Sequence, residues 1–479
     1  MAVGSSNAFD LVVLGAGTGG YSAAFRAAQF GLKVALVDAE KIGGTCLHVG
    51  CIPTKAMLES ADLYARIKKA GDFGIGIGAD PPTVDFATIA KRRGQVVERL
   101  HKGLQSLVKK NKVEFIHGRG TLRGGKHVEI DALDDDGKPA GHRTLDATDV
   151  ILATGSRVKS LPGLTPDGKS IVTSDDILRS DRLPASLIVV GAGAVGVEFA
   201  SFYADLGTTV TVLEYLPAVV PLEDREVSAE LERSLKRRGI TVMTKARFDT
   251  AAVKVNKAGV SLMVGPEGEA PKELSAEQLL VATGRAANIE NVGLETTRAK
   301  VEKGVVQVDP KTMRTAEPHL YAIGDIIGGL WLAHVAAHEG MAAVASIVGA
   351  EAEEVDYLKM PRATYCRPQI ASIGRSEQEL ERDGVAFKTG KFPWIANGKA
   401  LIGGDYEGFA KVIADARTDE LLGVHLIGPH VTDLIAEASA AMLLESTAWE
   451  LGAAVHPHPT LSEALGEAAM GVAGRAINF

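Results

Sequence analysis

The feature that most constrains the fold of this chain is a strand–turn–helix–strand pattern that occurs twice. In each copy an apolar run leads into a glycine-rich turn, a helical pattern follows, and a second apolar run ends in an acidic residue. Glycines spaced G-x-G-x-x-G allow a tight turn and close approach of the backbone to a pyrophosphate, which the next helix N-terminus faces. The turns GAGTGG and GAGAVG have this spacing, with Gly15, Gly17 and Gly20 in the first copy and Gly191, Gly193 and Gly196 in the second.

The two copies also agree beyond their glycines. Asp38 and Glu214 each close the second strand, 23 residues after the first glycine of their copy. Each copy is followed by an apolar strand that ends in the same tripeptide, in DVILATGS and in LLVATGR. An internal repeat of this kind predicts two dinucleotides bound by one chain. The alternative is that one copy is a degenerate structural unit, although both keep every glycine and the acid.

The length of 479 residues predicts about three domains rather than one core. We expect an α/β fold with two Rossmann-like dinucleotide-binding domains and a C-terminal α+β domain. The first copy carries an insertion with two cysteines and a long amphipathic helix from Phe86 to Leu107. The expected boundaries are 1–156 for the first nucleotide domain, 157–285 for the second, 286–350 for a second part of the first, and 351–479 for the C-terminal domain.

Composition excludes several classes of function. A hydrophobic content of 46% and a charged content of 23% are typical of a soluble globular protein. The net charge of −8 argues against nucleic acid as a partner. No apolar run is long enough for a membrane span. The first residues have neither a charged segment before an apolar one nor an Arg-rich presequence, so we expect a cytoplasmic protein.

The loop GGTCLHVGCIPTK, residues 43–55, holds two of the three cysteines. In a regular helix Cys46 and Cys51 would have Cα atoms roughly 8–9 Å apart, whereas a disulfide needs about 4.4–6.8 Å. A bridge therefore requires distorted backbone, for which Gly50 and Pro53 are suitable breakers. A bridge in distorted backbone is readily reduced, which favours a catalytic disulfide. Two buried free thiols, or a metal site that includes His48, remain as alternatives.

The loop, together with YAIGD at 321–325 and HPTLSE at 458–463, resembles the pyridine nucleotide–disulfide oxidoreductases, and the resemblance covers the whole chain. Within that family it is similar to the members that oxidise dihydrolipoamide, where Asn is commoner than His48. The resemblance implies FAD in the first nucleotide domain, NAD in the second, and a homodimer formed by the C-terminal domain. It also implies a partner that carries the lipoyl group, either the acyltransferase core or a lipoyl-carrier protein of a 2-oxoacid dehydrogenase or glycine cleavage complex.

The resemblance also assigns roles to single residues. Cys51 is the flavin-proximal thiol that forms a charge-transfer complex, and Cys46 is the interchange thiol that faces the substrate. Lys55 lies beside the flavin N5 and pairs with Glu198. The expected FAD site comprises Gly15, Gly17, Gly20, Asp38, Thr45, Lys55, Gly120, Thr154, Gly155, Ser156, Asp325, Leu332, Ala333 and His334. The expected NAD site comprises Gly191, Gly193, Gly196, Glu198, Glu214 and Gly284.

The C-terminal motif allows two interpretations. By resemblance, His458 is the acid/base for the dithiol, Glu463 orients its ring, and the pair acts in the active site of the partner subunit. By local pattern alone, Thr460-x-x-Glu463 is a capping box that starts a helix. Both interpretations remain open at the level of sequence.

The strand-end acid predicts the coenzyme. Glu214 would bond the ribose 2′-OH of NAD and repel the 2′-phosphate of NADP, and no Arg or Lys follows it before Arg225. The predicted function is FAD- and disulfide-dependent oxidation of protein-bound dihydrolipoamide with NAD. The alternatives are another NAD(P)H-dependent disulfide reductase of the family and a noncatalytic flavoprotein that serves as a redox or binding module. We expect no metal at His334 and His338 despite their spacing.

Overall fold

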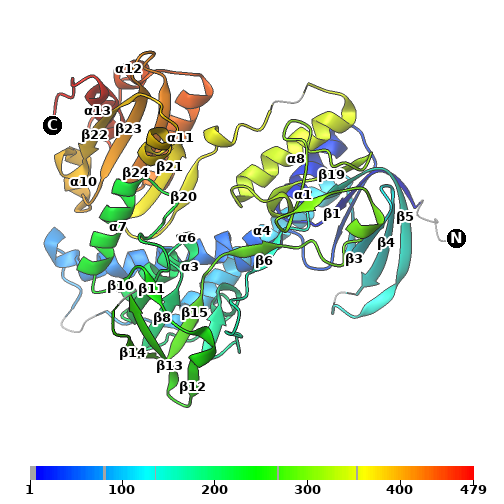
Figure 1. Cartoon of the computed structure of the whole chain (residues 1–479), viewed down its shortest axis with the longest axis horizontal. Coiled ribbons are helices and arrows are strands. Elements are labelled where there is room, and N and C mark those ends of the chain that lie inside the picture. Colours follow the sequence, from blue (N-terminus) through cyan, green and yellow to red (C-terminus); the bar gives the residue numbers. More distant parts are fainter. Residues whose placement is uncertain (1–6, 79–81, 135, 267–268, 352–353) are drawn as a thin grey trace. The chain divides into compact units, whose positions relative to one another are not determined.

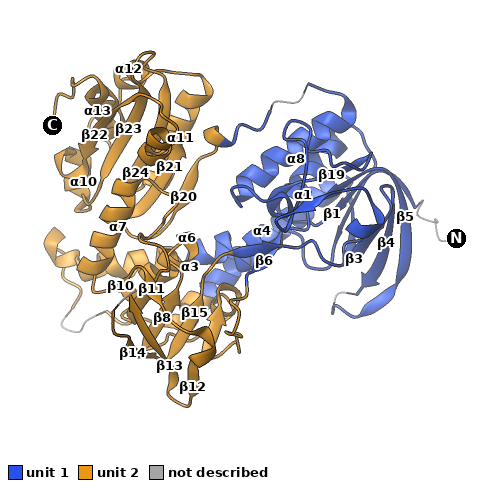
Figure 2. Cartoon of the chain, in the orientation of Figure 1, with its two compact units in different colours: residues 1–56, 91–159, 285–357 blue, residues 57–90, 160–284, 358–479 orange. Residues whose placement is uncertain are grey.

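The computed structural model describes residues 7–78, 82–134, 136–266, 269–351 and 354–479. The chain forms two compact units, drawn in blue and orange in Figure 2. Unit 1 comprises residues 1–56, 91–159 and 285–357, and unit 2 comprises residues 57–90, 160–284 and 358–479. The chain thus leaves and re-enters each unit, and we describe the two units separately.

Within the described residues of unit 1, the main sheet has six strands (Figure 1). Strand β1 pairs in parallel with β2 on one side and with β5 on the other, β2 pairs in parallel with β3, and β5 with β19. The long strands β3 and β5 extend further and enclose β4 in an antiparallel ribbon. The bounds are β1 Ala8–Leu14, β2 Val34–Asp38, β3 Glu114–Arg123, β4 His127–Leu133, β5 Pro139–Leu152 and β19 Leu320–Ala322.

The helices of unit 1 follow from the same patterns. Helix α1 (Thr18–Gln29) buries glycine and alanine and packs against α8 (Ala333–Val348), whose buried face is also made of small residues. The predicted amphipathic helix is confirmed as α4 (Phe86–Lys110). The remaining elements are α2 Gly44–Val49, α3 Cys51–Lys68, which continues into unit 2 after Ala56, β6 Ser156–Val158, β16 Arg285–Ala287, β17 Val301–Glu302 and β18 Val305–Val306.

The first sheet of unit 2 repeats the arrangement of unit 1. Its strand order is β10-β9-β8-β15-β7, so β8 lies between β9 and β15 as β1 lies between β2 and β5. Strands β11 to β14 form a separate antiparallel sheet around β13, whereas β4 is part of the main sheet of unit 1. The elements are β7 Ile171–Thr173, α5 Ser174–Ile177, β8 Ser186–Val190, α6 Ala194–Asp205, β9 Thr209–Leu213, α7 Arg225–Arg237, β10 Thr241–Met243, β11 Ala246–Arg247, β12 Lys254–Asn256, β13 Gly259–Pro266, β14 Lys272–Ala276 and β15 Gln278–Val281.

The C-terminal part of unit 2 has an antiparallel sheet in the order β20-β21-β24-β23-β22. Helices α11 and α13 cover strands of this sheet, and α12 packs against α13. The elements are β20 Arg362–Thr364, β21 Gln369–Gly374, α9 Glu377–Arg382, β22 Phe387–Pro393, α10 Gly398–Gly403, β23 Phe409–Asp415, β24 Leu421–Gly428, α11 Val431–Leu443, α12 Ala448–Ala453 and α13 Glu463–Val472. The prediction of an α+β region after residue 351 is therefore confirmed.

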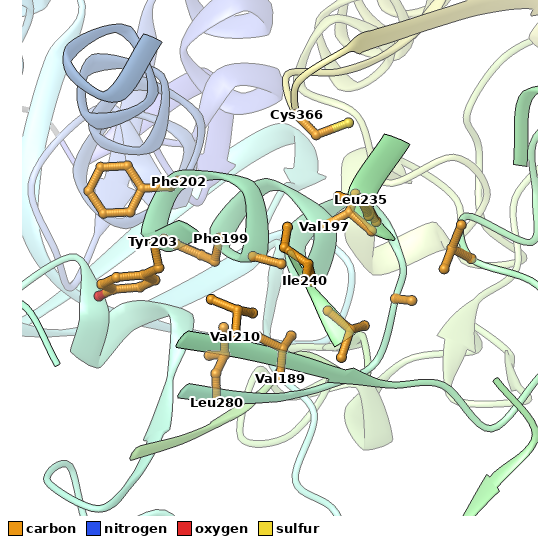
Figure 3. Close-up of a cluster of buried hydrophobic side chains, with 14 of the residues drawn as sticks. Val189, Val197, Phe199, Phe202, Tyr203, Val210, Leu235, Ile240, Leu280 and Cys366 are labelled. Atoms are coloured by element: carbon orange, nitrogen blue, oxygen red, sulfur yellow. The ribbon is translucent and has the colours of Figure 1, made fainter. Parts of the chain in front are cut away.

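One apolar core joins the two parts of unit 2. Figure 3 shows side chains of β8, α6 and β15, among them Val189, Phe199 and Leu280, in the same cluster as Cys366. Cys366 is 1% exposed and its thiol donates to the Pro368 carbonyl, so it is a buried thiol of this core. A buried ion pair between Lys411 of β23 and Asp224, the N-cap of α7, adds to this connection at 3.0 Å. The four-part domain division remains a prediction.

Candidate nucleotide and redox site

Both predicted nucleotide turns have the same backbone geometry. Gly15 and Gly191 adopt φ values of +105° and +104°. A Cβ atom would lie 2.1 Å from the Ala153 carbonyl oxygen in the first turn and 2.5 Å from that of Ala282 in the second. These carbonyls belong to the two ATG segments, so each fingerprint glycine fits against the strand end that the repeat pairs with it. A side chain at either position would break this contact.

The middle glycine of each turn has empty space where a side chain would begin. A Cβ atom at Gly193 would meet no atom within 4 Å, and one at Gly17 would meet only the Gly44 Cα, at 4.0 Å. Helices α1 and α6 begin directly after these glycines, at Thr18 and Ala194. Unpaired backbone N–H groups at a helix start attract phosphate. Both turns therefore fit the pyrophosphate of a dinucleotide.

Each strand-end acid accepts backbone hydrogen bonds, one of them from the glycine turn of its own copy. The carboxylate of Asp38 accepts the Ala16 N–H at 2.5 Å and the Glu40 N–H at 2.8 Å. The carboxylate of Glu214 accepts the Ala192 N–H at 2.7 Å and the Leu216 N–H at 2.8 Å. In both copies the acid therefore fixes the residue between the first two glycines. Burial raises the pKa of Asp38 against these hydrogen bonds.

The cysteine loop is two helices separated by one residue. Helix α2 ends at Val49, Gly50 turns the chain, and α3 begins at Cys51. A Cβ atom on Gly50 would lie 2.8 Å from the Thr45 carbonyl oxygen and 3.2 Å from the Cys46 Cα. The predicted break at Gly50 is confirmed. Pro53 is not a breaker, because it lies in the first turn of α3, where its missing N–H has no intrahelical partner to lose.

The break brings the two cysteines into side-chain contact. Both are free thiols in the structure, Cys46 half-buried and Cys51 exposed. A hydrogen bond to Cys51 and burial raise the pKa of Cys46, and the Lys55 charge opposes this rise. The role of Cys51 as the flavin-side thiolate remains a prediction.

The His48 ring lies against a backbone carbonyl. Its Nε2 lies 2.9 Å from the Ile42 carbonyl oxygen, and burial lowers its pKa. His101 of α4 reaches the same oxygen with Nδ1 at 3.2 Å. Among the described residues there is no group of three or more His, Cys, Asp or Glu side chains able to hold a metal ion.

Three of the other predicted FAD residues of unit 1, Thr154, Ser156 and Asp325, make side-chain hydrogen bonds. Ser156 donates its hydroxyl hydrogen bond to Asp325 and accepts from Arg285 Nε at 2.6 Å. Thr154 donates to the Asn288 carbonyl at 2.8 Å. The remaining members are Thr45 on α2, Gly155 with φ +68°, and Leu332, Ala333 and His334 at the start of α8.

Gly120 has a packing explanation as well. It lies in β3, where a Cβ atom would be 2.6 Å from the Leu14 side chain. Its place in the FAD site remains a prediction.

The sequence reasoning did not identify Glu339. This buried carboxylate of α8 accepts the Gly324 N–H at 2.6 Å and the Tyr357 hydroxyl at 2.8 Å, and burial raises its pKa. It thereby fixes the turn that carries Asp325. A signal existed in the sequence, since Glu339 is the only acid in the small, apolar helix AHVAAHEGMAAVASIV.

In unit 2, Glu198 is 4% exposed near the start of α6 and accepts the Tyr365 N–H at 2.8 Å. Its predicted partner Lys55 belongs to the other unit, so that pairing remains a prediction. Gly284 follows β15 with φ +112°, and a Cβ atom there would meet nothing within 4 Å.

Glu463 makes one contact from each of the two interpretations of the C-terminal motif. One carboxylate oxygen lies 2.8 Å from His458 Nδ1, and the other accepts the Thr460 N–H at 2.7 Å. The full capping box is absent, because α13 begins at Glu463 with Ser462 as its N-cap, and the buried Thr460 hydroxyl has no partner. Burial raises the pKa of Glu463, but the hydrogen bonds from Thr460 and His458 outweigh it and leave the pKa lowered. The His458 side chain is 79% exposed, so its Nε2 can meet another molecule.

Comparison with known proteins supports the same family along most of the chain. Residues 9–340 match the pyridine nucleotide-disulphide oxidoreductase model, and residues 360–469 match the dimerisation domain of that family. The chain is 45% identical to dihydrolipoyl dehydrogenase from Bacillus subtilis, over 98% of this chain and 99% of that protein. It is 42% identical to dihydrolipoyl dehydrogenase from Mycobacterium bovis, over 98% and 99% of the two chains.

Solved structures agree with this assignment. LpdA from Mycobacterium tuberculosis superposes with a TM-score of 0.87 at 29% identity, over 96% of this chain and 98% of that chain. The flavoprotein disulfide reductase RclA from Escherichia coli has the same fold, with a TM-score of 0.83 over 96% and 99% of the two chains, at 23% identity. No helix in the described ranges combines the length and apolar character that crossing a membrane requires.

The family consists of flavoproteins that use FAD and NAD(H), and its C-terminal domain supports a homodimer. The α/β architecture, the repeated nucleotide turns and the cysteine pair all agree with the family models. The chain therefore belongs to the pyridine nucleotide-disulphide oxidoreductase family, and the curated relatives that it matches over nearly its whole length are dihydrolipoyl dehydrogenases.

Proposed function

We propose that this chain oxidises protein-bound dihydrolipoamide, with FAD as its bound cofactor and NAD as the hydride acceptor. The observation that carries the proposal is the pair of thiols, Cys46 and Cys51, held in hydrogen-bond contact at the break between α2 and α3 directly beside the first nucleotide turn. The similarity to dihydrolipoyl dehydrogenases supplies the substrate.

The protein residues perform a thiol–disulfide exchange. A substrate thiolate attacks Cys46 in the oxidised pair, and Cys51 leaves as the thiolate. The second substrate thiol then attacks the mixed disulfide, so that Cys46 leaves and the lipoyl ring closes. Two electrons and two protons leave the dithiol, and the electrons reside on the reduced cysteine pair. Bound FAD would accept these electrons and supply the hydride for NAD.

The protons are managed by His458. Glu463 accepts from Nδ1, so the basic Nε2 faces outward to take the proton of the substrate thiol. The exposed position of His458 and the match to the dimerisation domain support action in the partner subunit's site.

Two further points belong to the proposal. The lipoyl group is carried by the acyltransferase core or a lipoyl-carrier protein of a multienzyme complex. Glu214 selects NAD, because its charge disfavours a 2′-phosphate. A cytoplasmic location remains a prediction from the sequence.

The direct test is steady-state turnover of the purified, FAD-loaded chain. We expect NADH to form with dihydrolipoamide and NAD, and much less product with NADP or with glutathione. Preferred reduction of another disulfide by NADPH would identify a different reductase of the family. A yellow, folded preparation with no turnover on any dithiol would support the noncatalytic flavoprotein.

Mixed dimers test the assignment across subunits. Pairing a Cys46→Ser chain with a His458→Gln chain leaves one site with wild-type residues at both positions. Activity restored from two inactive parents supports the assignment, and heterodimers that stay inactive while wild-type chains treated identically stay active contradict it.

A further inference from the structure

The segment that carries His458 has no regular secondary structure of its own. Residues 454–462 connect α12 to α13 without a helix or strand. Val455 is 97% exposed, and the His458 side chain 79%. An exposed imidazole on such a segment loses activity if it samples several positions, because displacement by about 1 Å can cost roughly a hundredfold in rate. Something behind the segment must therefore hold it.

The neighbouring histidine is largely covered while His458 is exposed. His456 Nε2 lies 2.6 Å from Glu437 Oε1 on α11, and its side chain is only 11% exposed. In straight extended backbone, residues two apart point to the same side. In the His-Pro-His sequence one ring is 11% exposed and the other 79%, so the two rings point in different directions.

The inward ring contacts two helices. Besides its pair with Glu437 of α11, the His456 ring packs on α13 at Gly466, where a Cβ atom would lie 3.3 Å from the ring Cε1 and Nδ1. A side chain at position 466 would push the His456 ring away, so this close contact depends on glycine. His456 therefore fixes the chain before His458 to both helices.

A second contact holds the chain after His458. Asn397 donates from Nδ2 to the Thr460 carbonyl at 3.0 Å, and its Oδ1 accepts the Ala400 N–H at 2.9 Å. The side chain belongs to a residue that is 4% exposed and N-caps α10. One buried amide thus connects the start of α10 to the segment two residues beyond His458.

We infer that His456, with Glu437, and Asn397 are positioning residues that hold the His458 segment from both sides for the dithiol step. This inference rests on the proposed function. Neither residue touches the substrate in this arrangement: they act through the placement of His458, whereas Glu463 acts on its ring directly.

The first experiment compares His456→Phe with His456→Gln. Phe keeps a ring of similar size but cannot donate to Glu437, and Gln keeps a donor. Dihydrolipoamide turnover should fall about 10- to 100-fold in His456→Phe and recover in part in His456→Gln. NADH-driven reduction of ferricyanide should be unchanged in both, since it does not use His458. Asp433→Asn, an exposed acid on the same helix α11, is the matched control and should retain full turnover.

The second comparison separates the two contacts of Asn397. Asn397→Asp keeps an acceptor for the Ala400 N–H, so the α10 cap survives, but it cannot donate to the Thr460 carbonyl. The same selective loss of dihydrolipoamide turnover should appear, with little change in melting temperature. Loss of stability with normal turnover in the folded enzyme would show a capping role alone and overturn the inference for Asn397.

Hydrogen exchange provides a readout that does not depend on the substrate. Amides of residues 454–462 should exchange faster in His456→Phe than in the wild-type holoenzyme, while those of the nucleotide turns remain unchanged. If wild-type protein lacks dihydrolipoamide turnover, the proposed function fails independently of this result. If wild-type protein is active, and His456→Phe shows normal turnover and unchanged exchange, the positioning inference is overturned.

Discussion

Replacing Glu214 by Gln tests two roles of this strand-end acid: its hydrogen bonds to the backbone of the turn and its selection of NAD over NADP. The Glu214 residue is 7% exposed, and its two carboxylate oxygens accept one backbone N–H each, at 2.7 and 2.8 Å. Glutamine has the same shape but offers one carbonyl oxygen, so its NH₂ group must face the second N–H. One hydrogen bond to a charged acceptor is lost, and a buried donor is left unpaired.

The size of the effect follows from that loss. A hydrogen bond to a charged group contributes about 1.5–3 kcal/mol. We therefore expect Glu214→Gln to lower the free energy of unfolding of the second nucleotide-binding part by about 1.5–3 kcal/mol, measured by denaturant unfolding without NAD. The ratio of kcat/KM for NAD over NADP should also fall, because the charge that repels a 2′-phosphate is removed.

The internal repeat supplies a matched control. Asp38→Asn likewise keeps one acceptor and loses the other of the equivalent pair of contacts in the first turn, and should cost a similar amount of stability and weaken FAD retention. It should leave the NAD/NADP ratio of FAD-loaded enzyme unchanged. Glu232→Gln, which removes an i,i+4 pair with Lys236 on α7, should cost only about 0.2–0.5 kcal/mol. A loss in Glu214→Gln no larger than in Glu232→Gln, or a wild-type preference for NADP, would refute the reasoning.

Three other predictions concern the redox loop and the acid/base. Iodoacetamide should modify Cys51 at lower pH than Cys46, because the hydrogen bond to Cys51 and burial raise the pKa of Cys46; identical pH dependence by peptide mass spectrometry contradicts this. Gly50→Ala should lower stability by about 1–3 kcal/mol, since its Cβ would lie 2.8 Å from a carbonyl oxygen, and an unchanged melting temperature argues against the close approach. His458→Gln should slow dihydrolipoamide turnover about 10²–10⁴-fold while ferricyanide reduction survives, and Glu463→Gln should slow it less; a silent Glu463→Gln would indicate capping alone.

The nucleotide turns were predictable from sequence because their constraints are local. Only glycine can occupy a position with φ near +105° where a Cβ atom would lie 2.1–2.5 Å from a carbonyl oxygen. The glycines at 15 and 191 therefore predict these turns directly from the sequence. The strand before and the helix after each turn follow from short-range periodicity. The order of strands in both sheets then follows from the same repeat.

The redox loop was predictable only in part. The sequence indicated that Cys46 and Cys51 need a distorted backbone, and the break lies at Gly50 as expected. Pro53 was assigned the wrong role because proline is compatible with the first turn of a helix as well as with a break. Which thiol loses its proton first depends on burial and on the hydrogen bond between the two sulfurs, neither of which is encoded in their spacing.

At the C-terminus the sequence posed two alternatives that the structure makes compatible. A carboxylate has two oxygens, so Glu463 serves His458 with one and the Thr460 N–H with the other. That His456 is buried and His458 exposed depends on Glu437, Gly466 and the start of α10, which packing brings together from separate parts of the chain. The sequence by itself determined the two nucleotide turns and the cysteine loop, because steric limits act between neighbouring residues. Only the tertiary structure decided which histidine faces outward and that burial and a hydrogen bond to Cys51 raise the pKa of Cys46, because burial and hydrogen bonding depend on residues that approach one another only when the chain is folded.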